Sequence, residues 1–588
     1  MPINISFAMK KIFIAFVILS FINQCFAQWV SPGDGQSYTL ESLCSAAPSA
    51  VMASSPGHYV ISQNLTLSAG DLLTLESSAM SVLVNDGVTL TISGSLQTAT
   101  RSQILVFQGD STQNNCFEFR FEDALQNSLS KVHFRHCQGI KLINSDITID
   151  SCEFDHFSNH VISYMNCNPI IRDSYFHDNQ ACAIQSAVNA DGCPKILNNV
   201  FYNNVLANTN NPQINIGPGT TDTIFIIGNR IEGVASTMSG GIGIMNMYNP
   251  AVTKVLLKDN VITNNRYGYT QNGYRISSEV YDNQFIDNNL EVNPNNGGSG
   301  ISVYGYDTTC AAKLRRNLIT GNLWGVTAIY YHHLDMGTTE DPGYNVLYNN
   351  GNGGVDYELY NNANSNMDAV GNYWGCDNDA TAEEVIFHQA DNPSYGLVNY
   401  LPIYVIEPEI LSFAFLAENN NIPNILPTDF YGTFSENGDS ILLNMGGLAS
   451  YGTHLLPTIT CPLGVSVSPS SLEPQNFVDS DIIYTATTPH QSSRSYVVFV
   501  EFGCAVSENA LTKINLAPNP VTQGFFTMEN PTEENLNWQI FTSTGQCVMF
   551  GEAQPGMNRI ATKTLKTGTY LVYIQKDNVF VSRKLTIR

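Results

Sequence analysis

One apolar position recurs at nearly regular intervals between residues 132 and 374. Each unit starts at a reference residue, in order Val132, Cys152, Ser174, Asn199, Asn229, Asn260, Asn283, Asn317, Asn345 and Asn372. The residue two positions later is apolar in all ten units, namely Phe134, Phe154, Phe176, Phe201, Ile231, Ile262, Phe285, Ile319, Leu347 and Trp374. Five positions after the reference, Asn recurs as Asn179, Asn204, Asn265, Asn288, Asn322 and Asn350. The intervals run from 20 residues (132 to 152) to 34 residues (283 to 317), which indicates a repeat architecture.

A unit of this length cannot bury its own apolar face, but stacked units bury one another's. The pattern therefore predicts a solenoid in which each unit is one coil of short strands and the recurring apolar residue points inward. The recurring Asn suits a corner with left-handed backbone, or a ladder of stacked amides. Coils that rise by about 4.8 Å each would make nine intervals roughly 43 Å long. Leucine-rich repeats need an L-x-x-L-x-L frame that this chain lacks, and propeller blades need about 40 residues or more.

Two nearly identical segments make the pattern specific: LKDNVITNNRYG at 257–268 and LRRNLITGNLWG at 314–325. The segment GNYWG at 371–375 is followed by YGLVNYLP at 395–402. These segments resemble the repeats and the closing coil of the pectin-lyase-like superfamily, over roughly residues 70–402. The resemblance implies an all-β, right-handed parallel β-helix. It implies no single activity, because such proteins include polysaccharide lyases, glycoside hydrolases, epimerases, adhesins and structural proteins.

We expect the β-helix to occupy 28–402, with a small helix within 38–52 capping its open end. The Asn repeat stops near residue 403, and short period-two stretches between Pro, Gly and Asn turns predict an antiparallel β-sandwich over 403–508. An immunoglobulin-like sandwich is one form that fits. We interpret this part as a spacer.

The last part of the chain, 509–588, carries four elements in order. They are Pro518-Asn519-Pro520, Ile540 with Gly545, Leu565 with Gly568 and Tyr570, and the basic end Lys584-Leu585-Thr586-Ile587. Their alternating strands and the turns that bound them predict a small all-β domain. They resemble the type A C-terminal sorting domain of the type IX secretion system of Bacteroidota. The resemblance implies the type IX secretion machinery as a partner, and an extracellular or outer-membrane surface location.

The N-terminus has the form of a secretory signal peptide. Two lysines precede the apolar run 12–22, and the segment ends at Ala27 before Gln28, where we expect processing. The run is too short to span a bilayer, which takes about 20 residues, and we predict no transmembrane segment.

The net charge and the cysteine spacing limit the classes of molecule and ion that the protein is expected to bind. The net charge of −25 repels nucleic acid and anionic lipid. The 13 cysteines include no CxxC pair and no cluster at zinc spacing, so we predict no metal site and no cofactor site. Isolated calcium sites on the acidic middle of the chain stay open as an alternative. Cys461 and Cys504 are the first disulfide to test, and most other cysteines should fill the coils as small apolar residues.

The candidate chemistry lies in the later coils, where long intervals place loops. Lys313, Arg315, His332, His333 and Asp335 gather cationic, imidazole and carboxylate groups within a short stretch. A lyase needs a base and a group that neutralises the uronate carboxylate, whereas a hydrolase needs two carboxylates. The leading hypothesis is a secreted protein that interacts with polysaccharide, with a lyase or a glycoside hydrolase as its enzymatic forms. The alternative is a non-catalytic surface adhesin or structural passenger in which these residues form a solvated loop.

Overall fold

The computed structural model describes residues 28–588 apart from 111–115, 188–189, 249, 422–425, 447, 503–509, 543–544 and 577–578. The described residues include neither the expected signal peptide, which ends at Ala27, nor Cys504 of the expected disulfide. The described chain forms two compact units. The first contains residues up to Ile410 with two short later segments, 461–467 and 486–494, and the second contains the remainder.

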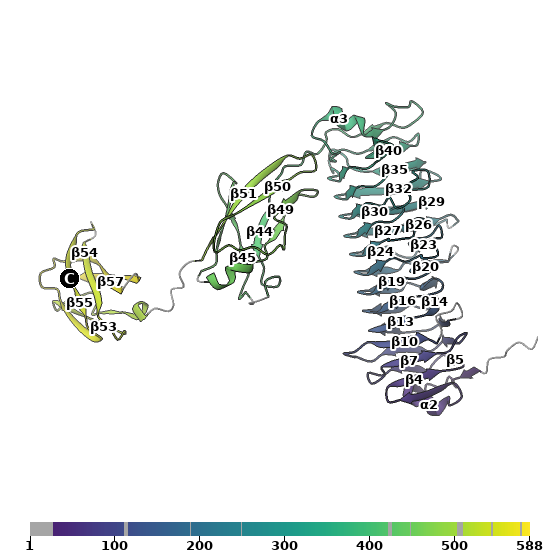
Figure 1. Cartoon of the computed structure of the whole chain (residues 1–588), viewed down its shortest axis with the longest axis horizontal. Coiled ribbons are helices and arrows are strands. Elements are labelled where there is room, and N and C mark those ends of the chain that lie inside the picture. The colour runs from purple at the N-terminus through teal and green to yellow at the C-terminus, as the bar shows by residue number, and fades with distance from the viewer. Residues whose placement is uncertain are drawn as a thin grey trace, which may run out of the picture. The chain divides into compact units, whose positions relative to one another are not determined.

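Three long sheets build the first unit, and through the middle of the stack each coil adds one strand to each sheet (Figure 1). Described neighbours in these three sheets pair in parallel, apart from β3 and β4, which pair antiparallel. The first unit is therefore the parallel β-helix that the repeat predicted. The 14-stranded sheet contains, in order, β1 (Gln28–Val30), β5 (Asn64–Leu67), β8 (Thr89–Ile92), β11 (Phe117–Glu122), β14 (Cys137–Ile143), β17 (Ile162–Met165), β20 (Ile184–Ser186), β23 (Pro212–Ile216), β26 (Gly240–Asn246), β29 (Tyr269–Gly273), β32 (Ser299–Gly305), β35 (Trp324–Tyr330), β40 (Leu359–Asn362) and β42 (Ile386–Phe387).

The 13-stranded sheet contains β3 (Val51–Ser55), β4 (His58–Ile61), β7 (Ser81–Val84), β10 (Leu105–Gly109), β13 (Val132–Arg135), β16 (Glu153–Asp155), β19 (Tyr175–His177), β22 (Val200–Tyr202), β25 (Arg230–Glu232), β28 (Val261–Thr263), β31 (Gln284–Ile286), β34 (Leu318–Thr320) and β37 (Val346–Tyr348). The 11-stranded sheet contains β12 (Asn127–Ser130), β15 (Ile147–Asp150), β18 (Ile170–Arg172), β21 (Lys195–Leu197), β24 (Ile224–Ile227), β27 (Thr253–Lys258), β30 (Ile276–Tyr281), β33 (Ala311–Arg315), β36 (His333–Asp335), β41 (Met367–Asp368) and β43 (Val398–Asn399). Two small sheets complete this unit: β2 (Ser37–Thr39), β6 (Leu72–Leu75) and β9 (Ser95–Thr98), and β38 (Gly351–Asn352) with β39 (Val355–Asp356).

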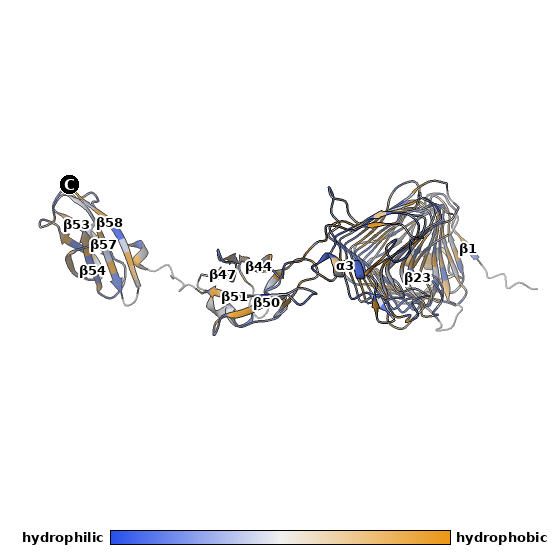
Figure 2. Ribbon diagram, turned by 90° about the horizontal axis from the view of Figure 1, so that it is seen from above, coloured by the Kyte–Doolittle hydropathy of each residue, from blue (hydrophilic) through white to orange (hydrophobic). Residues whose placement is uncertain are grey.

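The recurring apolar residues form one buried column through the 13-stranded sheet. Phe134 pairs with Phe154, Phe154 with Phe176 and Phe176 with Phe201 in direct register. The register continues through Ile231, Ile262, Phe285, Ile319 and Leu347, as predicted. These side chains are buried, and the Phe154 and Phe176 rings stack at 4.5 Å. Figure 2 looks down the stack and shows the coils superimposed around one closed cross-section. The interior is therefore a continuous apolar core rather than a series of separate ones.

The recurring asparagines are buried ladders, and the left-handed corner falls one residue earlier. Along the first ladder, Asn260 Nδ2 donates to Asn283 Oδ1 at 2.9 Å, and Asn283 Nδ2 to Asn317 Oδ1 at 3.0 Å. The positive φ angles belong to the preceding residues, such as Asp259 at 55° and Asp282 at 58°. Of the two roles expected for Asn, the ladder is the one that the structure has, because a residue in the corner points its side chain outward while the next points inward.

The two ends of the stack carry short helices. The helix expected within 38–52 is α2 (Leu40–Ala46), which buries Leu40 and Leu43 against the first coils. Near the other end lies α3 (Asp379–Glu384), N-capped by Asn378. Several cysteines fill the coils as small apolar residues, as predicted; those in the apolar core are Cys137, Cys152, Cys167, Cys193, Cys310 and Cys376.

Beyond residue 410 the described strands form a sandwich. Its sheets are β45 (Phe430–Tyr431), β44 (Ser412–Phe415) and β48 (Thr458–Thr460), and β46 (Thr433–Phe434), β47 (Ser440–Asn444), β51 (Ser493–Glu501), β50 (Ile482–Thr487) and β49 (Ser466–Ser468). A 3₁₀ helix spans Ala449–His454. Against the expectation of a purely antiparallel arrangement, β47 and β51 pair in parallel. The long connection between these two strands makes a crossover possible, which a hairpin would not.

The C-terminal module has its own core. After a 3₁₀ helix at Ala510–Lys513, one sheet holds β52 (Leu516–Ala517), β53 (Phe525–Asn530) and β56 (Gly556–Ala561). The other holds β55 (Cys547–Ala553), β54 (Leu536–Thr542), β57 (Gly568–Lys576) and β58 (Val579–Ile587). Between them lie buried Phe526, Met528, Ile540 and Leu585. The module is the small β-sandwich that the four terminal sequence elements predicted.

Candidate functional site

A groove of about 680 Å³ lies on the outward face of the 14-stranded sheet, across β23, β26, β29, β32, β35 and β40. Its walls come from two of the long loops, one before β23 and one before β32. The lining residues are Asn210, Asn211, Pro212, Asn215, Gly243, Met245, Arg266, Tyr267, Thr270, Asn272, Pro294, Asn295, Asn296, Gly297, Ser299, Ser302, Trp324, Thr327, Ile329, Tyr360 and Asn362. Asparagine, serine and threonine dominate this lining.

The floor of the groove is one register column of small and polar residues. Strand pairing aligns Asn215, Gly243, Thr270, Ser302, Thr327 and Tyr360 in neighbouring strands. The residues on either side in each strand point inward, such as Ile214 and Ile216 around Asn215. Gly243 leaves the floor open, since a Cβ there would meet Pro212 Cγ at 3.1 Å. Six strands spaced by about 4.8 Å give this column a length of roughly 24 Å.

A second column lies beside the first and adds amides. Met245 pairs with Asn272, and Ile329 pairs with Asn362 farther along the groove. The Asn272 Oδ1 atom is buried and has no hydrogen-bond partner among the described residues. A buried amide oxygen without a partner is an unsatisfied acceptor in the lining of the groove.

Aromatic rings close one end of the groove. The Trp324 ring lies 4.9 Å from the Tyr360 ring, and Tyr360 stacks on Phe387 at 4.6 Å with the planes 7° apart. The Trp324 Nε1 atom donates to Pro294 O at 3.1 Å, which ties the ring to the loop before β32. Ring faces held in this way are rigid apolar platforms beside the polar floor.

Arg266 is the charged residue among the described lining residues. It is only 7% exposed, and its guanidinium lies 4.9 Å from the centre of the Tyr267 ring. Within the described part of the chain it forms no ion pair, and its Nε atom has no hydrogen-bond partner. Burial raises the pKa of the neighbouring Tyr267, although the charge of Arg266 and a hydrogen bond from its guanidinium oppose this rise. A buried cation without a carboxylate beside it favours an anionic ligand group.

The cationic residues singled out in the sequence lie on a different sheet. Lys313 and Arg315 belong to β33, and Asp335 belongs to the neighbouring β36. Arg315 Nη2 lies 2.9 Å from Asp335 Oδ1 and 3.0 Å from Asp341 Oδ2, and Lys313 Nζ lies 2.7 Å from the same Asp341 atom. Hydrogen bonds from Arg315 and Lys313 lower the pKa of Asp341 to about 2. The structure thus brings Lys313, Arg315 and Asp335 together, but as a charge-compensated network.

The two histidines of that stretch point in opposite directions. His332 is buried, with Nε2 3.4 Å from Asn361 Oδ1, whereas His333 is exposed on β36. Burial lowers the pKa of His332 to about 4, so this imidazole is neutral near pH 7. His332 is therefore part of the interior of the coil.

Gln28, the expected first residue after processing, lies in β1 at the opposite end of the stack.

The residues of the groove did not stand out in the sequence. One signal was present, because two of the three longest intervals, 199–229 and 283–317, hold Asn210-Asn211-Pro212 and Pro294-Asn295-Asn296-Gly297. Asn and Gly in long loops are common for reasons of turn geometry alone, so this signal does not separate a binding wall from an ordinary loop. The strand register that aligns the floor appears only in the folded chain.

Comparison with known proteins identifies two segments of the chain. Residues 515–588 match the family model of the secretion system C-terminal sorting domain, and residues 268–379 match a protein family of unknown function, DUF1565. No sequence among the curated proteins matches this chain. A variant of the periplasmic alginate epimerase AlgG is similar over 63% of this chain and 83% of that one, with 12% identity and a TM-score of 0.41. The Dettilon tailspike protein is similar over 89% and 85% of the two chains, with 11% identity and a TM-score of 0.24.

Fold and terminal module together define the class. The chain is a right-handed parallel β-helix protein with a C-terminal sorting domain of the type IX secretion system, which marks proteins that are secreted or displayed at the cell surface. In the described residues, no helix combines the length and the apolar character that a membrane span requires.

Proposed function

We propose that this protein binds an acidic polysaccharide in the groove of the 14-stranded sheet. The observation that carries the proposal is the combination of a buried Arg266, which has no ion-pair partner among the described residues, with a floor of amides and hydroxyls. A glycan presents hydroxyl groups at short, regular intervals, and amide and hydroxyl side chains can both donate to them and accept from them. Arg266 would meet a carboxylate or sulfate group, for which a planar guanidinium is well suited.

Trp324 would supply the apolar part of recognition. A pyranose has a C–H face that packs on an aromatic ring, and the Trp324 ring is held at the end of the groove by Tyr360 and by the Pro294 carbonyl. The floor, roughly 24 Å long, would span several sugar units. A groove open along the strand stack suits an internal stretch of polymer rather than one sugar.

Binding is better supported than cleavage. The described lining residues include Arg266 but no Asp, Glu, His or Lys, and elimination or hydrolysis needs a base or a pair of carboxylates at the bond. Lys313 and Arg315, proposed in the sequence for such roles, are engaged by Asp335 and Asp341 on another sheet. A polysaccharide lyase or hydrolase remains the second candidate, and its catalytic residues would be a histidine and acids such as His333 and Asp335.

The proposal includes the route of the protein. The signal peptide 1–27 would be removed between Ala27 and Gln28, and the β-helix of 28–402 and the sandwich of 403–508 would cross the outer membrane with the sorting domain of 509–588. The mature protein would then act outside the cell or on the outer-membrane surface. N-terminal sequencing of secreted material tests the first step, since a start at any residue other than Gln28 contradicts it.

The binding experiment compares acidic and neutral glycans on the wild-type protein and two groove variants. Isothermal titration should show binding of at least one uronate or sulfated polymer. Arg266→Gln should weaken that binding tenfold or more, which corresponds to about 1.4 kcal/mol, and Trp324→Ala should weaken it similarly. Arg230→Gln and Tyr248→Ala, at exposed positions outside the groove, serve as matched charge and aromatic controls and should bind like the wild type.

Two results would reject the proposal: no binding across the panel, or binding that neither groove variant changes. Each incubation is also read for unsaturated product by ultraviolet absorbance and for new reducing ends. Release of either product would favour the enzymatic candidate over simple binding.

A further inference from the structure

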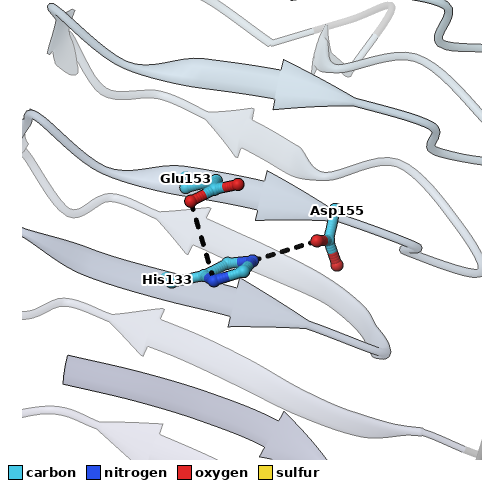
Figure 3. A group of neighbouring side chains, drawn as sticks. All are labelled: His133, Glu153 and Asp155. Atoms are coloured by element: carbon cyan, nitrogen blue, oxygen red, sulfur yellow. Dashed lines mark hydrogen bonds and ion pairs between the residues drawn. The ribbon is translucent and has the colours of Figure 1, made fainter. Parts of the chain in front are cut away.

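A cluster of histidines and carboxylates lies on the outward face of the 13-stranded sheet, on β13, β16 and β19. Figure 3 shows His133 between Glu153 and Asp155 of the next coil. His133 Nε2 lies 3.0 Å from Asp155 Oδ2, and His133 Nδ1 lies 3.7 Å from Glu153 Oε2. One ligand atom from each of the three residues can be chosen so that all lie within 4.8 Å of one another. This spacing is compatible with a single ion bound at about 2.0–2.2 Å from each ligand.

His177, one coil farther along, extends the cluster. Its Nε2 atom lies 3.1 Å from Glu153 Oε1 and 3.9 Å from Asp155 Oδ2. Strand register explains the grouping, because Glu153 pairs with His133, and Asp155 pairs with His177. Two imidazoles and two carboxylates thus meet from three consecutive coils of a rigid sheet.

The outer contacts of His177 are those of a metal-ligating histidine. Its Nδ1 atom lies 3.0 Å from Asp178 Oδ2, and Asp178 Oδ1 accepts from Asn203 Nδ2 at 2.8 Å. A carboxylate on Nδ1 fixes the tautomer that leaves the Nε2 lone pair facing the cluster, as in carboxylate–histidine–zinc arrangements. The Tyr175 ring stacks on the imidazole at 4.2 Å and holds its plane.

The two carboxylate oxygens of Asp155 contact different neighbours. Oδ1 lies 3.3 Å from Arg135 Nε and 3.1 Å from His156 Nδ1, whereas Oδ2 faces His133 and His177. The Asp155 side chain is almost fully buried, while Glu153 and both histidines keep partial access to solvent. One buried, oriented ligand oxygen with an accessible side is what an ion needs in order to enter and stay.

We propose that His133, Glu153, Asp155 and His177 bind one divalent transition-metal ion of the Zn²⁺ type. Mixed imidazole and carboxylate ligands favour zinc over calcium or magnesium, which take oxygen ligands. The ion would connect three consecutive coils on a face other than that of the groove. The site is independent of the proposed polysaccharide binding.

The test uses the mature full chain with Zn²⁺ alone. Competition against a chromophoric chelator should show one tightly bound equivalent, and Zn²⁺ should raise the melting temperature. His133→Gln and His177→Gln should each weaken binding at least tenfold and lose the shift, and Asp178→Asn should weaken it less. His454→Gln, at an exposed position in the second unit, is the matched control and should bind like the wild type.

Co²⁺ provides a readout that does not depend on the variants folding. The wild-type protein should develop visible d–d bands without the near-ultraviolet charge-transfer band of thiolate ligation. Absence of a tight equivalent, a thiolate band, or binding that folded His133→Gln and His177→Gln both retain would overturn the assignment.

Discussion

The Asn ladder allows a sharp stability prediction at Asn283, which makes five side-chain hydrogen bonds. Its Nδ2 donates to Leu257 O, Tyr281 O and Asn317 Oδ1, and its Oδ1 accepts from Asn260 N and Asn260 Nδ2, all at 2.9 to 3.0 Å. Asn283→Ala leaves the buried Asn260 N–H without a partner, which costs about 1–3 kcal/mol, and removes further bonds worth about 1 kcal/mol each. The two hydrogens of Nδ2 are shared among three acceptors and count as two bonds, so with the bond from Asn260 Nδ2 three further bonds are lost. We expect a total loss of about 4–6 kcal/mol.

Asn283→Asp keeps the shape of the side chain and should nevertheless be worse than alanine at pH 7. The second carboxylate oxygen would face three acceptors, Leu257 O, Tyr281 O and Asn317 Oδ1, and no donor. This environment raises the pKa of the introduced carboxyl group in the folded state, so the destabilisation is greatest above that pKa and shrinks toward acid pH. The aspartate variant should therefore recover relative to alanine below about pH 4.

Urea unfolding followed by far-ultraviolet circular dichroism gives the ranking of the variants. Asn364→Ala, at an exposed position of the same β-helix, is the control and should change stability by less than about 0.5 kcal/mol. An aspartate variant as stable as the alanine variant at pH 7 would refute the donor role of the Nδ2 group.

Three further changes test the interior of the coils. Burial raises the pKa of Glu358 to about 8. Its contribution to the stability of the folded state is therefore complete below about pH 4.5 and is lost as pH rises through 8, a loss of up to about 5 kcal/mol. Glu358→Gln should flatten the corresponding fall in melting temperature. Burial lowers the pKa of His332 to about 4, so the wild type loses up to about 3 kcal/mol as pH falls from 6.5 to 4, and His332→Gln should remove that loss in the same melting scans. Phe154 stacks between Phe134 and Phe176. Phe154→Ala should therefore lower the free energy of unfolding in urea by about 3–5 kcal/mol, and Phe154→Leu should lower it clearly less. Equal losses for the two variants would contradict the stacking argument.

The sequence by itself determined the repeat and what it implies. Phe134, Phe154 and Phe176 were recognised as one column because a fixed offset from the reference position gives a fixed direction on a strand. The terminal module could also be predicted from the sequence, since its turns and strands are local in the chain. Local periodicity fixes which side chains face inward, and the stack then follows from the need to bury them.

A second Asn ladder runs from Asn179 to Asn350, and the local sequence pattern is not enough to predict all of its contacts. The Asn series breaks at Val234, and Gln213 fills the gap by accepting from Asn204 and donating to Asn265, 52 residues away. Glu358 ends the same ladder on Asn350, from outside the repeat frame. Neither contact follows from spacing, because the intervening loops differ in length.

Only the tertiary structure decided which outward-facing groups meet. Arg266 has no ion-pair partner in the described chain, whereas Arg315, with the same side chain, is bound by Asp335 and Asp341. The groove floor and the His133 cluster likewise join residues from different coils. Outward side chains carry no burial signal in the sequence, and their neighbours are set by coil-to-coil register, which depends on every loop in between.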